Sequence, residues 1–355
     1  AVTNGITLDT DYTVTLNFSG TGIAASDYTD PGTITVNDGN LPLTVNVNIP
    51  DDGVWEPNEA LTATLVDPNG TDLVSFAGSA SCNIDNVNAV SFALSGPAGT
   101  IDEENNATAT FTVTPTGADV ESGYTISVNY GTIDVIGEAQ AGQDYSVTFG
   151  IAPFSGTLSA YTIDVPITND NFVEPDQLFR ARLVDPVLDD VTVDTTPVDA
   201  TIDSGDTATV TIDSFPNSVD EGDVTGAYAV NIDNPIEGAG DLTVSWTAVS
   251  GTADVATDLD APTSGTVVIA PLSSSSSFTV DTATDMNVEG SETFSVQLTG
   301  ATATDTSVDG DITPDATVVG PTTINETDYA DINVSAVSLS VQEDIDLADM
   351  EVVFD

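Results

Sequence analysis

An all-β fold made of tandem β-sandwiches is predicted by three features of this 355-residue sequence. Short runs of apolar residues alternate with Thr, Ser and Asn, which is the period-two pattern of a strand with one buried face. Turn-forming pairs such as Asp-Gly and Ser-Gly separate the runs, and β-branched residues dominate them. A set of acidic motifs recurs about every 120 residues, which indicates repeated domains.

Alternating runs that predict strands occur along the whole chain. Among the clearest are residues 12–18, 43–49 and 124–130, where an apolar residue occupies every second position. We find no long segment with the 3.6-residue period of an amphipathic helix, so many short strands favour β-sandwiches. The single cysteine, Cys82, excludes an internal disulfide framework. It lies in an alternating segment, and we expect it to be a small buried core residue.

The charge of the chain is strongly unbalanced. Asp and Glu number 58 against two basic residues, Arg180 and Arg182, and neither Lys nor His occurs. Hydrophobic residues form 40% of the sequence, so the chain is not a disordered acidic tail. Two carboxylates about 4 Å apart repel by roughly 1 kcal/mol in water and about 4 kcal/mol at an intermediate dielectric, so the fold needs counter-ions. Nucleic acids and anionic membranes are poor partners because both require a basic face. No apolar stretch reaches the length of a membrane span.

Acidic residues recur at matching positions in three places. Each of three loops contains an Asp followed four residues later by a Glu: Asp52/Glu56, Asp170/Glu174 and Asp285/Glu289. A further Asp precedes these Glu residues by 29 to 31 positions: Asp27, Asp144 and Asp258. An isoleucine also precedes a glutamate by 19 residues three times: Ile84/Glu103, Ile202/Glu221 and Ile324/Glu343. Acids that recur in the same order favour ligand clusters over scattered surface charge.

These motifs resemble the Calx-beta domain, a calcium-binding β-sandwich module of immunoglobulin-like architecture. The resemblance rests on SVDEGD around Glu221, on the segments GTADVATD and AGQDY, and on the loop ATDMNVEGSETF. It covers nearly the whole chain and implies sandwiches that gather their acidic segments at one end to bind Ca2+. The chemistry agrees, because calcium takes six to eight oxygen ligands from carboxylates, carbonyls and water.

The resemblance assigns calcium ligands to every repeat. They are Asp27, Asp52, Glu56, Glu59 and Asp85 in the first repeat, Glu103, Asp144, Asp170, Glu174 and Asp203 in the second, and Glu221, Asp258, Asp285, Glu289 and Glu292 in the third. Three positions depart from the pattern: Gln177 stands where Glu59 and Glu292 stand, Asn325 replaces an Asp, and Leu259 replaces Tyr28 and Tyr145. The third site is therefore expected to hold fewer ions or to hold them differently. The alternative is that these carboxylates are merely solvated loop charges. The acids outside the clusters also fit the surface acidity of a salt-loving organism, which is compatible with calcium binding.

The domain organisation follows from the repeats. We predict an incomplete sandwich at 1–88 that lacks its opening strands, two complete sandwiches at 89–206 and 207–328, and a C-terminal strand segment at 329–355. Residues 332–344 match residues 210–222 in spacing and alternation, so the missing opening strands reappear at the other end. Across a join between two copies, Glu343 and Asp27 would be 39 residues apart, between the 37 and 41 found for the equivalent acids within the chain.

The sequence thus predicts a structural protomer whose tail completes the first sandwich of a neighbouring copy by strand addition. Such a contact is head-to-tail and builds a homopolymer when it does not close. Glu343 would enter the neighbour's acidic cluster, and calcium is expected near the domain junctions. The predicted function is that of a calcium-stabilised extracellular filament. Alternatives are a calcium-binding adhesin or surface module and a piece of a longer repeat array.

An enzyme is not expected, because a chain without His or Lys lacks the usual bases and nucleophile pairs. Paired carboxylates could cleave glycosides, but a sugar groove needs aromatic residues and only two Trp occur. The chain begins at Ala1 without Met, which agrees with a removed signal peptide, and hence secretion, or with an incomplete chain. Candidate glycosylation sites are Asn17, Asn69, Asn106, Asn325 and Asn333.

Overall fold

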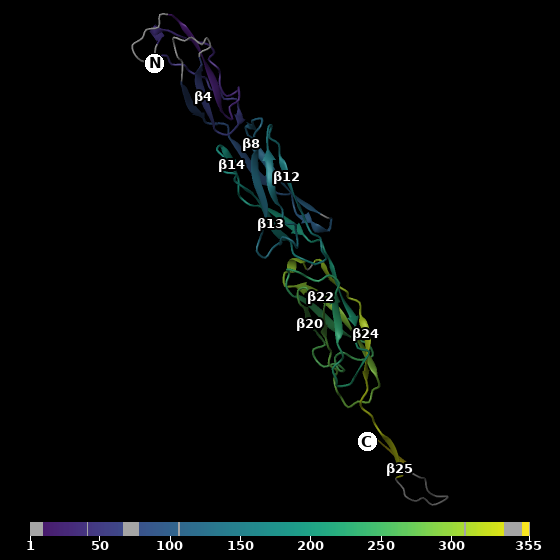
Figure 1. The fold of residues 1–355 in the computed structure, drawn as a ribbon. Coiled ribbons are helices and arrows are strands. Elements are labelled where there is room, and N and C mark those ends of the chain that lie inside the picture. Colours follow the sequence, from purple (N-terminus) through teal and green to yellow (C-terminus); the bar gives the residue numbers. More distant parts are fainter. Residues whose placement is uncertain are drawn as a thin grey trace, which may run out of the picture. The chain divides into compact units, whose positions relative to one another are not determined.

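The computed structural model describes residues 10–40, 42–66, 78–105, 107–308, 310–336 and 350–354. These residues form 26 strands and three short 3-10 helices, and contain no α-helix, which confirms the predicted all-β fold. Strands occur along the whole described chain (Figure 1). The chain divides into two compact units. The first comprises Ala1–Ile101, Ala107–Thr168 and Leu178–Thr201, and the second comprises Asp102–Asn106, Asn169–Gln177 and Ile202–Asp355.

The first repeat forms a four-stranded antiparallel sheet in the order β2-β1-β4-β5. Its strands are β1 (Tyr12–Thr21), β2 (Ile34–Val36), β4 (Glu59–Val66) and β5 (Ser79–Ile84), with the 3-10 helix η1 (Asp38–Asn40) after β2. Within residues 10–40, 42–66 and 78–84, no second sheet of this repeat is formed. Cys82 of β5 is consequently exposed, so its predicted burial is wrong. An alternating pattern marks a buried face only where a second layer covers it.

Residues 43–49 are predicted as a strand, and this prediction is wrong for the described chain, since they form no strand. Leu43 and Ile49 are exposed, and Val45 and Val47 are half-buried. In the middle repeat the equivalent segment pairs with a preceding strand. The described residues before β1 provide no such partner, so the alternating pattern is present without the hydrogen-bonding ladder that would make it a strand.

The middle repeat is a two-sheet sandwich. One sheet has the order β12-β8-β6-β14 and the other β11-β10-β13-β15-β7. The strands are β6 (Val90–Ser95), β7 (Ile101–Asp102), β8 (Thr108–Gly117), β10 (Ile126–Asp134), β11 (Phe149–Phe154), β12 (Tyr161–Pro166), β13 (Gln177–Val184), β14 (Val191–Val193) and β15 (Val198–Asp203), with the 3-10 helix η2 (Glu103–Asn105) after β7. A small parallel pair, β3 (Val54–Trp55) with β9 (Asp119–Val120), connects the first repeat to this sandwich.

The core of the middle sandwich lies between its two sheets. Phe111 of β8 and Phe179 of β13 are fully buried, with ring centroids 5.9 Å apart in an edge-to-face arrangement. Tyr145 stacks on Phe179 at 4.3 Å. Tyr145 directly follows the predicted ligand Asp144, so core packing anchors one of the acidic loops.

The third repeat repeats this topology, with sheets in the order β21-β18-β16-β23 and β20-β19-β22-β24-β17. Its strands are β16 (Ala208–Ser214), β17 (Ser218–Asp220), β18 (Tyr228–Ile232), β19 (Leu242–Ser250), β20 (Ser264–Ile269), β21 (Ser275–Phe278), β22 (Glu292–Ala303), β23 (Ile312–Pro314) and β24 (Val319–Asn325), with the 3-10 helix η3 (Thr306–Val308) after β22. In its core, Trp246 stacks on Phe278 at 4.3 Å and Phe278 on Tyr228 at 5.1 Å. The second tryptophan is thus a core residue.

The C-terminal segment forms a separate antiparallel pair of β25 (Ile332–Ala336) and β26 (Met350–Phe354). β26 begins 122 residues after β18 begins, and β25 ends 122 residues after β16 ends. The tail therefore repeats the spacing of the two strands that open the third sandwich. Val337, Leu339, Val341 and Glu343 lie outside the described residues.

Candidate metal centres

The acidic loops of the first repeat bring several carboxylates together. Oxygen atoms of Asp27, Glu56 and Glu121 lie within 4.8 Å of one another. Glu121 does not belong to the first repeat but follows β9 of the middle one. Glu59, the first residue of β4, lies beside these three, and the charges of Asp27 and Glu121 raise its pKa. We call Asp27, Glu56, Glu59 and Glu121 the first acidic cluster.

Burial and repulsion make this cluster unfavourable when all of its carboxyls are ionised. Asp27 is 4% exposed and Glu59 is 5% exposed. Burial, a hydrogen bond with Glu121 and the neighbouring charges raise the pKa of Glu56 to about 8. Burial and the charge of Asp27 raise the pKa of Glu59 to about 7, although the Tyr124 hydroxyl donates to its Oε1 at 3.3 Å. A cation among these oxygens would remove the repulsion.

The remaining predicted ligands of the first repeat line an adjacent hollow. Asp52, Glu56 and Asp85 are among its lining residues. Glu56 therefore faces both the hollow and the first acidic cluster. All five predicted residues of this repeat lie in or next to one acidic region.

The Asp that precedes each acidic loop by about 30 residues is held by the same kind of backbone turn. The carboxylates of Asp27, Asp144 and Asp258 accept hydrogen bonds from backbone N–H groups three or four residues earlier in the chain: Ala24, Gln140 and Asp254 respectively. The bond from Gln140 measures 2.5 Å and that from Asp254 2.7 Å. These local turns set the direction of each carboxylate before any ligand binds.

The Asp that opens each acidic loop is held by a second turn. Its carboxylate accepts a hydrogen bond from the backbone N–H two residues further on, in the pairs Asp52–Val54, Asp170–Phe172 and Asp285–Asn287, at 3.1, 2.8 and 2.7 Å. The recurrence of the same turn in three repeats explains why the sequence spacing of the acids is so regular. Short-range backbone geometry, and not repulsion, determines where these side chains lie.

In the middle repeat, carboxylate oxygens of Glu103, Asp170 and Glu174 lie within 4.8 Å of one another. Glu103 is 2% exposed and Glu174 is 7% exposed. Asp206, also buried, adjoins Asp170, and burial together with Glu104 raises the pKa of Asp206 to about 6. All of these residues belong to the second compact unit.

Two further predicted ligands of the middle repeat, Asp144 and Asp203, are not part of this group of converging oxygens. Asp203 is exposed. Desolvation, and then the charges of Asp203 and Asp311, raise the pKa of Asp176. Asp144 belongs to the first compact unit. The Oε1 atom of Gln177, at the position of Glu59, is buried, and a side-chain amide oxygen is itself a calcium ligand.

The third repeat gathers its predicted ligands in one hollow. The lining residues include Glu221, Asp258, Asp285, Glu289 and Glu292, which are all five that the sequence indicates. Two groups of oxygens lie within 4.8 Å of one another: Asp258 with Glu289 and Glu292, and Glu221 with Glu326 and Asp328. The backbone N–H groups of Glu289, Asp328 and Gly290 donate to Glu326 and lower its pKa to about 2.

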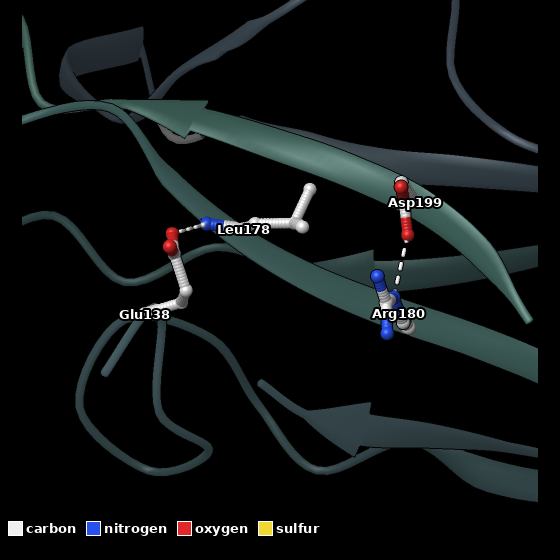
Figure 2. Close-up of polar contacts among 4 residues, drawn as sticks. All are labelled: Glu138, Leu178, Arg180 and Asp199. Atoms are coloured by element: carbon white, nitrogen blue, oxygen red, sulfur yellow. Dashed lines mark hydrogen bonds and ion pairs between the residues drawn. The ribbon is translucent and has the colours of Figure 1, made fainter. Parts of the chain in front are cut away.

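Basic residues do not neutralise these sites. The one salt bridge among the described residues joins Arg180 to Asp199, with Nε and Oδ1 2.6 Å apart, on neighbouring strands of the middle sandwich (Figure 2). Arg182 of the same strand is exposed. Figure 2 also shows Glu138 accepting a hydrogen bond from the backbone N–H of Leu178 at 3.0 Å. With no Lys or His in the chain, the buried carboxylates have to be balanced by protons or by bound cations.

Sequence reasoning missed four acids that the structure places at the clusters. Asp206 and Asp328 each stand four residues after an isoleucine that closes a strand, Ile202 and Ile324, and this offset could have identified them. Glu326 takes the place next to Asn325, whose own side chain donates to Asp220 at 2.9 Å. Glu121 comes from a neighbouring repeat, so spacing within one repeat does not find it. The predicted ligand Glu343 lies outside the described residues.

The arrangement is suited to hard cations. Several carboxylate oxygens converge in each repeat, with backbone turns that hold them and with no nitrogen or sulfur ligand among the grouped residues. Oxygen-only sites of this kind are typical of Ca2+, whose flexible coordination accepts six to eight such ligands. Within the described part of the chain, no helix has the length and apolar character of a membrane span.

Comparison with known proteins gives one family. The Calx-beta domain model matches the sequence three times, at residues 1–88, 85–212 and 203–328. The crystal structure of CBD12 from CALX1.2 is similar at 15% identity and a TM-score of 0.30, covering 66% of this chain and 100% of that chain. The crystal structure of calcium binding domain CBD12 of CALX1.1 is similar at 20% identity and a TM-score of 0.28, covering 59% and 80%. An Escherichia coli alpha-2-macroglobulin activated by porcine elastase matches at 12% identity and a TM-score of 0.20, covering 92% and 31%. The comparison with curated proteins gives no match.

Proposed function

The chain belongs to the Calx-beta domain family, and on this premise we propose that it binds calcium in each repeat and is a structural protomer of an extracellular filament. Copies join head to tail, and the C-terminal segment of one copy completes the first sandwich of the next. Calcium stiffens the junctions between repeats. The protein has no catalytic task.

The observation that carries calcium binding is the burial of unbalanced carboxylates. Asp27, Glu59, Glu103 and Glu174 are all less than a tenth exposed. A buried ionised carboxylate without a cation costs several kcal/mol, and the chain offers only two arginines for 58 acids. Generic surface acidity does not explain acids that are buried and convergent. A divalent cation at each cluster does.

Strand complementation is supported by a segment of the first repeat that lacks a partner strand and by the spacing of the tail strands β25 and β26. Residues 43–49 of the first repeat keep an alternating pattern but lack the partner that β12 has in β8. The tail strand β26 corresponds by its spacing to β18, the strand that pairs with β21 in the third sandwich. A β26 strand from another copy would therefore be the natural partner of residues 43–49. Glu343 would reach the neighbour's first acidic cluster, as Glu221 reaches the third hollow.

Calcium is expected to raise the melting temperature of the full chain. Binding to the native state alone stabilises it by about 2.7 kcal/mol at a hundredfold excess over Kd, and extracellular calcium modules bind at roughly 0.1–1 mM. We expect a melting temperature about 5–15 °C higher in saturating calcium than in chelator at low salt. Superimposable melting curves in chelator and in calcium would favour the halophilic explanation of the acids.

A single substitution makes this test sharper. Glu59→Gln removes a buried charge from the first acidic cluster, so it should stabilise the first repeat in chelator and reduce its gain from calcium. The two effects have opposite signs, which a purely structural role of Glu59 does not predict. Glu138→Gln is the matched control, because Glu138 belongs to none of the groups of converging carboxylates and accepts a backbone hydrogen bond that Gln can also accept. Calorimetric melting of the variants in both buffers measures the difference.

A further inference from the structure

We infer that the first two calcium sites are each completed by a carboxylate from the following repeat: Glu121 completes the first site and Glu237 the second. This inference rests on the proposed calcium binding and deepens it. A calcium ion would then be coordinated by two neighbouring repeats. Binding of the ion would fix the joint between these repeats at the same time.

The backbone holds Glu121 in the first acidic cluster. Strands β3 and β9 pair in parallel with Trp55 opposite Val120, so the next residues, Glu56 and Glu121, lie side by side. The Glu121 N–H donates to the Trp55 carbonyl at 2.9 Å. Like charges on paired neighbouring strands are unfavourable. A cation between these adjacent glutamates would remove the repulsion at the end of the paired segments.

Contacts around Trp55 fix this joint. Trp55 is buried, and its indole Nε1–H donates to the carbonyl of Asp189 in the middle sandwich at 3.0 Å. Asn58 donates to the Asp189 carboxylate at 3.2 Å and Asn88 to Asp51 at 2.9 Å. Glu121 is therefore part of a packed interface and not of a loose loop.

A buried, unpartnered oxygen points to a ligand at the same place. Glu59 is 5% exposed, and its Oε2 is buried without a hydrogen-bond partner among the described residues. The charges that act on it are those of Asp27 and Glu121. A native structure rarely leaves a buried carboxylate oxygen unsatisfied, so a bound cation is the simplest partner.

The second compact unit repeats the arrangement. Val173 forms a parallel bridge with Ile236, and the N–H of Glu237 donates to the Val173 carbonyl at 3.2 Å. Glu174 follows Val173 as Glu56 follows Trp55, and Glu237 follows Ile236 as Glu121 follows Val120. The backbone thus places Glu237 beside Glu174 of the second site. The same parallel backbone pairing occurs at two successive junctions between repeats, which a chance contact between acids does not explain.

The test is a calcium titration of the full chain with Trp246→Phe as background, so that Trp55 is the remaining fluorescent tryptophan. Calorimetry of the same samples counts all the sites. Glu121→Gln is expected to weaken the calcium affinity reported by Trp55 on the order of tenfold, because one charged ligand is lost. Glu237→Gln is expected to weaken a different site, seen by calorimetry, by a similar factor. Glu138→Gln should titrate like the background.

The outcomes separate the two levels of the proposal. If the background binds calcium and Glu121→Gln binds it equally well by both readouts, the shared ligand is refuted while calcium binding stands. If the background shows neither a fluorescence change nor heat, calcium binding itself fails.

Discussion

A chain that ends at residue 329 is expected to form no filaments under calcium conditions in which the full chain assembles. The truncation removes β25 and β26, whose spacing matches the opening strands of the third sandwich. Without them, residues 43–49 of every copy keep an unpaired edge. Electron microscopy and sedimentation of both proteins measure the result. Filaments of ordinary length from the truncated chain would contradict the tail's role.

Two further experiments distinguish a loss of assembly from a simple folding defect. The double substitution Val45→Asp and Val47→Asp alters the accepting segment and leaves the tail intact. Burying a Val side chain contributes about 1.5–3 kcal/mol, so losing two should raise the concentration required for assembly at least about a hundredfold. Val268→Asp, at an exposed valine of β20 in the third sandwich, is the control. A free peptide of residues 330–355 should cap the accepting heads and stop growth of the unmodified protein.

The fold was predictable from the sequence where a second layer exists. Residues 124–130 alternate and largely become β10, whose Ile126 and Val128 are fully buried. Residues 43–49 alternate equally well and form no strand, and Cys82 alternates and is exposed. Periodicity reports which residues would face a core, but whether that core is present depends on strands that lie elsewhere in the sequence or on another copy.

The candidate sites were predictable where the acids repeat at a fixed offset. Asp52, Asp170 and Asp285 make the same turn to the residue two positions on, so local backbone geometry kept their spacing constant. Glu121 was not predictable in this way, because a parallel pairing between repeats brings it to the cluster. Asp203 stands at a matching offset but is exposed, while Asp206 is buried. Alternation along the segment after Ile202 decides which of the two turns inward.

The stability of the middle sandwich should depend on Phe179 far more than on its neighbour Arg180. Phe179→Ala is expected to lower the free energy of unfolding by about 3–5 kcal/mol, because it empties a fully buried site. It also removes the stacking partner of Tyr145, which follows Asp144, so calcium should recover little of the loss.

Arg180→Gln is the matched comparison, since Arg180 is the next residue of β13 and points away from the core toward Asp199 (Figure 2). A partly exposed ion pair contributes about 0–1 kcal/mol, and less at high salt. Denaturant unfolding of both variants in saturating calcium measures the difference. Equal losses would mean that the rare basic residues, and not the aromatic core, hold this sandwich together. A large loss in Phe179→Ala with a small one in Arg180→Gln is the expected result, because in a chain of 58 acids and two arginines the core and bound cations carry the stability that ion pairs cannot.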